Sequence, residues 1–153
     1  MWKSKHSVIL SLVVCFIVAA VLIVSLFAAP YILNTVFSNW RGLSPLAFQK
    51  VMKTIFICYY PSAILGLVAL AALIKMLFNI KKEQIFIKPN IDCLRIISWC
   101  CFIVCAICLL GLKVYFSLIF VCAAAGFMGL ILRVVKNVMQ SAIELKDEND
   151  LTI

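Results

Sequence analysis

Charge is scarce in this chain, and acidic charge is the scarcest. Of its 153 residues, 66% are hydrophobic and only 13% are charged, with six Asp and Glu against 14 Lys and Arg. The mean hydropathy of +1.18 excludes a soluble globular core and predicts a polytopic membrane protein with a single membrane domain, residues 1–153. Because the basic residues flank apolar runs, we attribute the net charge of +8 to topology and anionic lipid, and we expect no direct nucleic-acid binding.

Ionisable residues are missing from the middle of every long apolar run. Such residues are costly in hydrocarbon and mark ion pathways, so their absence argues against a proton- or cation-coupled small exporter, which needs an acid buried in its first span. The sequence contains no HExxH motif, no glycine-rich phosphate loop and no Ser/His/Asp set. The one histidine, His6, lies beside Lys3 and Lys5 and is expected to contact headgroups. We therefore predict no enzyme activity, no cofactor and no metal site.

Cysteine is abundant, but it is absent where a redox relay would need it. Seven of the eight cysteines, all but Cys93, fall within apolar runs. Cys105 and Cys108 form a CxxC pair of the kind that a quinone-linked, disulfide-generating membrane enzyme uses. Such an enzyme also needs a second pair in an outer loop, and residues 34–53 contain no cysteine. Small packing residues are the favoured interpretation; thiol-redox chemistry and soft-metal binding are the alternatives.

Four apolar runs are long enough to cross a hydrocarbon core of ~30 Å as helices. They predict spans at about 7–29, 54–74, 96–112 and 114–132. Pro30 is expected to kink or end the first span, and Asn90 to cap the helix that becomes the third. Lys113 leaves only a very tight turn before the fourth span. A cleaved signal peptide is the alternative for the N-terminus, but the first run is far longer than the roughly 7–15 apolar residues of a signal peptide.

The basic residues are distributed unequally between the two sides of the membrane that four spans define. The termini and the loop 79–95 share one side, and the polar connection 34–53 lies on the other. Ten of the 14 basic residues fall on the first side: Lys3, Lys5, Lys75, Lys81, Lys82, Lys88, Arg95, Arg133, Lys136 and Lys146. The second side has Arg41, Lys50, Lys53 and Lys113. The positive-inside rule therefore predicts cytoplasmic termini in a bacterial plasma membrane.

The helical period continues beyond the fourth span into residues 133–153, which we call the arm. Apolar residues recur there every three or four positions, which predicts an amphipathic helix that extends the span. The stripe consists of Ile131, Val135, Val138, Ala142 and Leu145. Two interpretations remain open: the stripe packs on headgroups or on the protein's own loop, or it docks on another chain.

Acidic residues are concentrated at the end of the arm. Glu144, Asp147, Glu148 and Asp150 are four of the six in the chain, and an apolar Leu-Thr-Ile ending follows them. We predict that this tail is held weakly by the basic loop of the same protein until a partner competes for it. The predicted loop contacts are Lys81, Lys82, Phe86, Asn90 and Arg95.

Two segments of the chain carry a family resemblance. The ending RVVKNVMQSAIELKDENDLTI and the earlier segment EQIFIKPNIDCLR resemble the recognisable pieces of a bacterial membrane-protein family, domain of unknown function 2975. The resemblance implies a protein of similar size with four spans and no established activity. It also suggests a small helix-turn-helix regulator as a cytoplasmic partner, because such regulators are commonly encoded beside family members. The glycine that usually precedes the Phe segment is absent here, where Glu83-Gln84 stands.

These observations predict an all-α membrane protein, a four-transmembrane-helix bundle with a C-terminal amphipathic cytoplasmic helix extending the fourth span. We expect a non-enzymatic regulatory or accessory protein that contacts the lipid bilayer, a cytoplasmic protein partner and further copies of itself. A small transport, channel or bacteriocin-immunity component is the alternative, and a membrane thiol-redox protein is the second. The predicted partner-binding residues are Val135, Asn137, Val138, Ala142, Leu145, Glu148, Asn149, Asp150, Leu151, Thr152 and Ile153. Helix packing in the fourth span is assigned to Cys122, Ala125, Gly126 and Gly129, which have small-xxx-small spacing.

Overall fold

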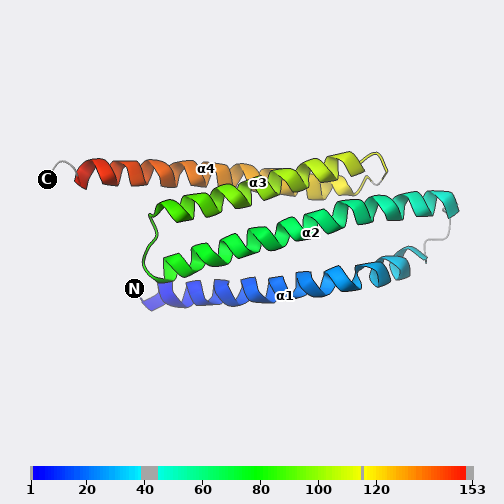
Figure 1. The fold of residues 1–153 in the computed structure, drawn as a ribbon, viewed down its shortest axis with the longest axis horizontal. Coiled ribbons are helices and arrows are strands. Elements are labelled where there is room, and N and C mark those ends of the chain that lie inside the picture. Colours follow the sequence, from blue (N-terminus) through cyan, green and yellow to red (C-terminus); the bar gives the residue numbers. More distant parts are fainter. Residues whose placement is uncertain (1, 39–44, 115, 151–153) are drawn as a thin grey trace.

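The computed structural model describes residues 2–38, 45–114 and 116–150. This part of the chain forms four α-helices and no strand (Figure 1): α1 (Trp2–Ser38), α2 (Pro45–Lys81), α3 (Lys88–Gly111) and α4 (Leu118–Asp150). All four helices are long and apolar enough to cross a membrane. The prediction of an all-α, four-span membrane protein is confirmed.

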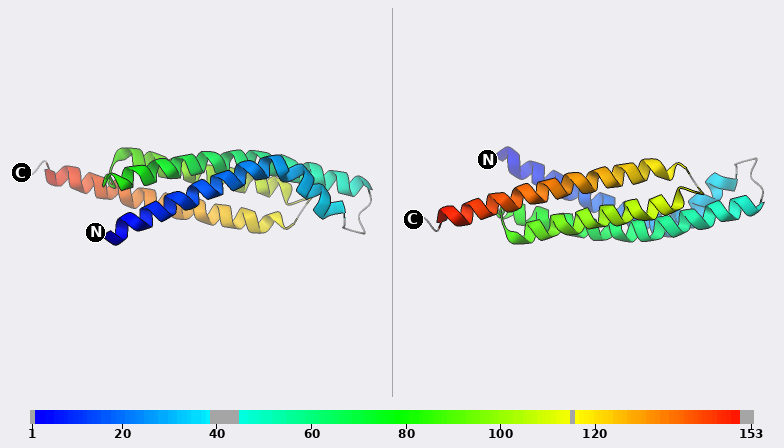
Figure 2. Two further views of the ribbon diagram at one scale, coloured as in Figure 1. Left: turned by 90° about the horizontal axis from the view of Figure 1, so that it is seen from below. Right: turned by 90° about the horizontal axis from the view of Figure 1, so that it is seen from above.

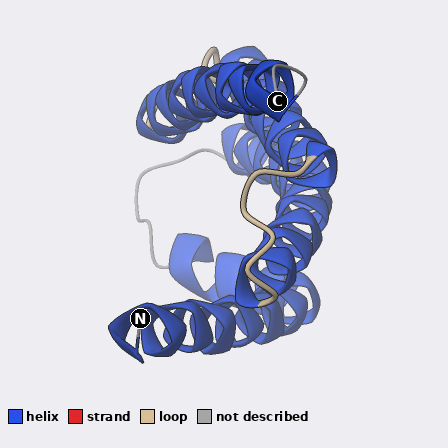
Figure 3. Ribbon diagram, turned by 90° about the vertical axis from the view of Figure 1, so that its left-hand side faces the viewer, coloured by secondary structure: helices blue, strands red, loops and turns tan. Residues whose placement is uncertain are grey.

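Consecutive helices run antiparallel and pack side by side in chain order. α1 packs on α2, α2 on α3 and α3 on α4, and within the described ranges no other pair of helices is in contact. Seen end-on, the helices form an open arc with α1 and α4 at its two tips (Figure 3). The start of α1, the end of α4 and the α2–α3 loop lie at one end of the long axis of the molecule, which we call the terminal end (Figure 1).

The centre of the packing is α3, which lies between α2 and α4. About a third of its most apolar stretch is buried, against 11% for each of the other helices. Its Cys93 and Ile97 form a core cluster with Ala72 of α2, and Leu132 of α4 packs against that cluster. α1, by contrast, leaves large side chains such as Phe27 exposed, and in a membrane these contact lipid.

The seam between α3 and α4 is close because α4 presents Gly129 there. A Cβ atom at Gly129 would lie 3.3 Å from the Cβ of Cys101 and 3.3 Å from the ring of Phe102. Ser98 Oγ of α3 donates a hydrogen bond to the Gly129 carbonyl oxygen at 3.0 Å. In hydrocarbon, close backbone approach and interhelical hydrogen bonds of this kind hold helices together.

The same seam continues toward the α3–α4 turn. A Cβ atom at Gly126 would lie 3.3 Å from the Cys105 sulfur, and the sulfur of buried Cys122 lies 3.2 Å from that of Cys105. Ala125 is partly buried beside them. The structure thus places all four residues of the predicted small-residue patch on or next to the α3–α4 interface.

The helices extend further than the apolar runs suggest. α1 passes through Pro30 and ends at Ser38, so the proline does not end the helix; membrane helices tolerate the carbonyl that a proline leaves unbonded. α2 begins at Pro45, since proline suits the first position of a helix, where its missing N–H costs nothing. The expected connection 34–53 is therefore shorter than predicted, and its residues 39–44 lie outside the described part of the chain.

The α3–α4 turn is longer than the very tight turn expected at Lys113. α3 ends at Gly111 and α4 begins only at Leu118, whereas the apolar run suggested a start at Val114. The Val114 N–H donates to the Gly111 carbonyl oxygen at 3.1 Å, which starts the turn. A Cβ atom at Gly111 would lie 2.7 Å from Cδ1 of Leu118 and 2.8 Å from the Cys58 sulfur, so a larger residue here would require these side chains to shift.

The helices are staggered along the long axis of the molecule. At the terminal end, α4 extends past the three other helices (Figure 2). At the opposite end, α2 extends past the α3–α4 turn (Figure 1). The C-terminal part of α4 is therefore the most projecting helical segment at the terminal end.

Candidate functional site

The arm is a straight continuation of α4, helical through Asp150. Its inner positions are Lys136 and Met139, which are partly buried, and Ile143, which is only 7% exposed. Val138 and Leu145, at 64% and 62% exposure, point away from the rest of the protein. The predicted stripe is therefore not the face that packs on α3.

The other predicted partner-binding residues lie mostly on the exposed side of the arm. Val135 is 41% exposed, Asn137 is exposed, and Ala142 at the edge of the packed face is partly buried. Glu148 and Asn149 lie exposed near the end of the helix. Asp150 is its last residue, and Leu151, Thr152 and Ile153 lie outside the described residues.

A cleft of about 350 Å³ separates the start of α3 from the arm. Ile91 of α3 and Ile143 of α4 are both nearly fully buried, so its floor is apolar. The remaining lining residues are polar or charged: Lys88, Asp92, Arg95, Gln140, Glu144 and Asp147. A concave site with an apolar floor and a ring of polar groups is the usual form of a binding site in proteins.

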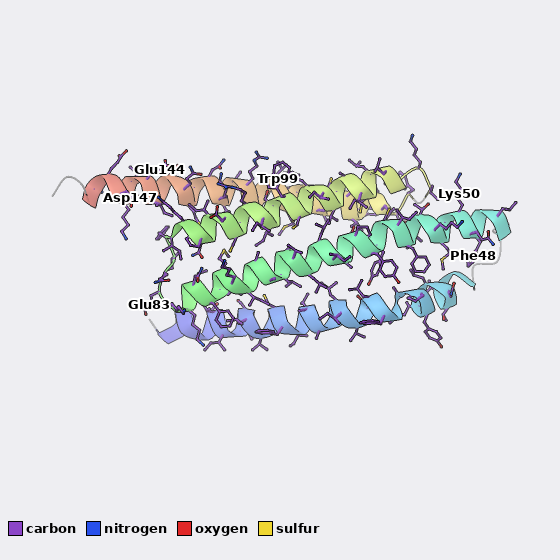
Figure 4. All side chains as sticks on the ribbon, viewed as in Figure 1. Phe48, Lys50, Glu83, Trp99, Glu144 and Asp147 are labelled. Carbon is purple, nitrogen blue, oxygen red and sulfur yellow. The ribbon has the colours of Figure 1, made fainter. Side chains whose placement is uncertain are left out.

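Opposite charges face each other across this cleft. The cations Lys88 and Arg95 come from α3, and the acids Glu144 and Asp147 come from α4. Figure 4 shows both acids on the part of α4 beside the start of α3, at the same end as Glu83. Arg95 is already engaged by Asp92 of its own helix, with 3.4 Å between Nη1 and the carboxylate. Glu144 accepts a hydrogen bond of 3.1 Å from Gln140.

Asn90 holds the loop beside this cleft in place. It is completely buried and accepts a hydrogen bond of 2.8 Å from Asn79 of α2. Its own amide donates to the carbonyl oxygens of Gln84 and Ile85, at 3.0 and 2.8 Å. The prediction that Asn90 is the N-cap of α3 was wrong: Ile87 occupies that position and Pro89 follows in the first turn. Asn90 instead ties α2, the loop and α3 together.

The loop begins with a left-handed residue at Glu83, whose φ is 65°. The Gln84 N–H donates to the Asn79 carbonyl oxygen at 3.1 Å, and the Glu83 N–H to that of Ile80 at 2.9 Å. These two bonds form a Schellman motif, in which glycine is the preferred residue at the left-handed position. This is the position at which the family resemblance led us to expect a glycine, and Glu83 stands there instead.

The predicted loop contacts divide into two groups. Arg95 lines the cleft beside the arm, and Asn90 is bonded to Asn79, Gln84 and Ile85, none of them in the arm. Lys81, Lys82 and Phe86 are exposed and do not line the cleft. The lysine that lines the cleft is Lys88, whereas Lys81 and Lys82 were expected to face the arm. The weak contact between the acidic tail and the loop stays a prediction.

Sequence reasoning missed the inner face of the arm, although a signal for it was present. Gln140, Ile143, Glu144 and Asp147 are spaced by three, one and three residues, so they share one helical face. This face continues the seam of Cys122, Gly126 and Gly129 along the same helix. Extending that small-residue seam by the helical period identifies the packed face of the arm.

Cysteines from two other helices approach the CxxC segment of α3. The sulfur of Cys105 lies next to that of Cys122 on α4. Cys58 approaches the same region from α2, with 3.7 Å between its sulfur and the Ile107 carbonyl oxygen. Within residues 2–38, 45–114 and 116–150 no group of three or more Cys, His, Asp or Glu residues has the geometry to hold a metal ion.

Comparison with known proteins gives one family. A family model described as "Protein of unknown function (DUF2975)" matches residues 41–153, which include α2, α3, α4 and the complete cleft. α1, the helix at one tip of the arc, precedes the matched region. No curated protein matches the chain, and no solved structure does.

Proposed function

The chain belongs to the DUF2975 family of proteins of unknown function, and from that premise we propose that it is a non-enzymatic regulatory or accessory protein of the bacterial cytoplasmic membrane. Its arm contacts a cytoplasmic protein partner. The excess of basic residues at the terminal end supports a cytoplasmic position for the arm, the α2–α3 loop and both termini. The family resemblance suggests a helix-turn-helix regulator as that partner.

The observation that carries this proposal is the straight course of α4 beyond the membrane. Leu145 follows the last residue of the uncharged run, Leu132, by thirteen positions, a distance of about 20 Å along a helix. Even at a tilt of about 40°, roughly 15 Å of that distance remains along the membrane normal. Headgroups extend only about 5–7 Å beyond the hydrocarbon on each side. A helix on this course does not lie on the headgroups.

The exposed stripe of the arm therefore has no lipid to cover its outer half. Leu145 is 62% exposed, and Val138, 64% exposed, lies about 9 Å along the helix from Leu132, at the outer edge of the headgroups. The inner side of the arm faces α3 across the cleft. Apolar side chains that recur along one face of a projecting helix fit a groove on a partner protein, as in helix-in-groove recognition. The acids at the end of the arm fit a partner with a basic rim.

Site-specific photocrosslinking in living cells tests this proposal. A photoreactive amino acid is placed at Val138, at Leu145 or at Ile143. We expect the first two positions to form an adduct with one and the same soluble protein, identified by mass spectrometry. Ile143 is the matched control: it lies on the same helix but faces α3, so it should crosslink only within the chain.

The result must also depend on the chemistry of the stripe. Changing Leu145 to Asp should abolish the adduct from Val138 while membrane insertion stays normal. Adducts with lipid alone at Val138 and Leu145, or the same protein adduct from Ile143, would contradict docking by the stripe.

Removal of the tail separates this proposal from the transport, channel or immunity alternative. If the spans and their oligomerisation carry the activity, deletion of residues 146–153 leaves the cellular phenotype unchanged. If the arm carries it, the phenotype of this truncation equals that of a full deletion although the protein still inserts. Replacing Cys105 and Cys108 by Ser tests the thiol-redox alternative: if redox chemistry carries the activity, this variant loses the phenotype although it still inserts.

A further inference from the structure

A small basic cavity lies where α3 enters the apolar region and α4 leaves it. It measures about 100 Å³ and is lined by Arg95, Ser98, Trp99, Arg133 and Lys136. Three of these five residues are cations and none is an acid. The cavity is separate from the cleft of the arm, although Arg95 lines both.

The contact between α3 and α4 brings the cations to one depth. The hydrogen bond from Ser98 to the Gly129 carbonyl oxygen fixes the register of the two antiparallel helices. Arg95 precedes Ser98 by three residues and Arg133 follows Gly129 by four, so the two arginines lie about 4.5 and 6 Å from this bond toward the terminal end. Arg95 is the last charged residue before the apolar run of α3, and Arg133 is the first charged residue after that of α4. They therefore lie at the boundary between hydrocarbon and headgroups.

Trp99 forms the membrane side of the cavity and is 57% exposed, with its position on α3 labelled in Figure 4. An exposed indole beside arginines at the edge of an apolar span is typical of the headgroup level. Asp92 lies 3.4 Å from Arg95 and neutralises part of its charge. Arg133 and Lys136 on α4 supply the remaining excess of positive charge.

We infer that this cavity binds the phosphate of an anionic phospholipid. Its volume of about 100 Å³ is enough for a phosphodiester group. Guanidinium groups bind phosphate oxygens through paired hydrogen bonds, and basic pockets between membrane helices on the cytoplasmic side are suited to acidic headgroups. A phosphate held here contacts α3 and α4 at once and braces the base of the arm. The inference does not depend on the partner proposed above.

Fluorescence of Trp99 reports binding at this position directly. The variant Trp2→Phe/Trp40→Phe leaves Trp99 as the sole tryptophan, because the chain has three. The purified full-length variant in neutral detergent is titrated with phosphatidylglycerol carrying brominated acyl chains, which quench indole on contact. We expect saturable quenching, with brominated phosphatidylcholine binding at least about tenfold more weakly.

Two double variants of equal charge change separate this site from general surface charge. Arg133→Gln/Lys136→Gln should weaken phosphatidylglycerol binding at least about tenfold, since each cation near an acidic headgroup is worth about fivefold in affinity. Lys81→Gln/Lys82→Gln, at the same end of the molecule but outside the cavity, should change it less than about twofold. Arg95→Gln, a single change in the same cavity, should also weaken phosphatidylglycerol binding. It takes the place of the first double variant if that variant fails to fold.

Three outcomes would overturn the inference. Equal losses in both double variants would mean diffuse charge and no site. Equal quenching by the two brominated lipids would mean no preference for an acidic headgroup. Displacement of the lipid by millimolar inorganic phosphate would identify a site for a soluble phosphate compound instead of a lipid.

Discussion

At the scale of single residues, the loop beside the arm depends on two positions that the sequence describes poorly. Glu83 adopts a backbone conformation that favours glycine. Asn90 looks like a local helix cap after a proline but is buried and bonded to three other residues. Local capping patterns do not predict this role, because the partners of Asn90 come from another helix and from the loop.

Changing Glu83 to Gly should give a more stable protein than changing Glu83 to Ala. A side chain at positive φ costs about 1–2 kcal/mol, and the greater freedom of glycine in the unfolded chain offsets part of the gain. We expect the free energy of unfolding of the Gly variant to exceed that of Glu83→Ala by about 0.5–1 kcal/mol, measured by denaturant titration in detergent. The Ala variant is the control, because both changes remove the side chain but only Gly relieves the backbone. Equal stability of the two variants would contradict the left-handed turn.

Changing Asn90 to Asp should destabilise the loop. A carboxylate oxygen would replace the amide that donates to the Gln84 and Ile85 carbonyl oxygens, which leaves buried polar groups unpaired. Each such group costs about 1–3 kcal/mol, so we expect a loss of at least about 2 kcal/mol and faster tryptic cleavage after Lys82. Asn137→Asp on the exposed side of α4 makes the same chemical change and should alter neither. A stable, protease-resistant Asn90→Asp variant would show that Asn90 is not the anchor of the loop.

At the scale of helices, the apolar runs correctly predict the number and type of elements but not their ends. Apolar runs indicate which residues lie in the hydrocarbon core of the membrane. A helix, however, continues until residues that end it are reached. For this reason α1 and α2 are longer than their predicted spans. The orientation of the arm was also difficult to predict. Both of its faces carry apolar residues, and the choice between them is made by the small-residue seam in the membrane, which fixes the rotation of all of α4.

Oxidative crosslinking tests this seam. With all other cysteines changed to Ser, the pair Cys105 and Cys122 should form a disulfide readily with copper phenanthroline, which accepts the two electrons as both thiols lose their protons. Their sulfurs lie 3.2 Å apart across the interface. An engineered protease site between α3 and α4 then gives fragments that stay joined only without reductant. The matched pair Cys100 and Cys122, on the same two helices, should not crosslink. Crosslinking of both pairs alike would contradict the observed seam.

At the scale of the complete molecule, the sequence could not predict that the layer of helices is open. Periodicity shows which faces of a helix are apolar, but lipid and protein are equally apolar neighbours within a membrane. The open arc leaves α1 and α4 apart (Figure 3). The family match begins after α1 and includes the other three helices. The portion of the chain shared with the family is thus the portion that builds the cleft, the basic cavity and the arm.

The proposed function requires that the terminal end, with its arm, faces the cytoplasm. This orientation rests on ten basic residues against four and on the shared position of both termini at one end of the molecule (Figure 1). Paired reporter fusions measure it directly in cells. A fluorescent protein that matures only in the cytoplasm should be bright when fused after Ile153. Alkaline phosphatase, which is active only outside the cytoplasm, should be active when inserted near Gly42. The reverse pattern, a dark C-terminal fusion with inactive phosphatase at Gly42, would contradict the account, because no cytoplasmic partner would then reach the arm.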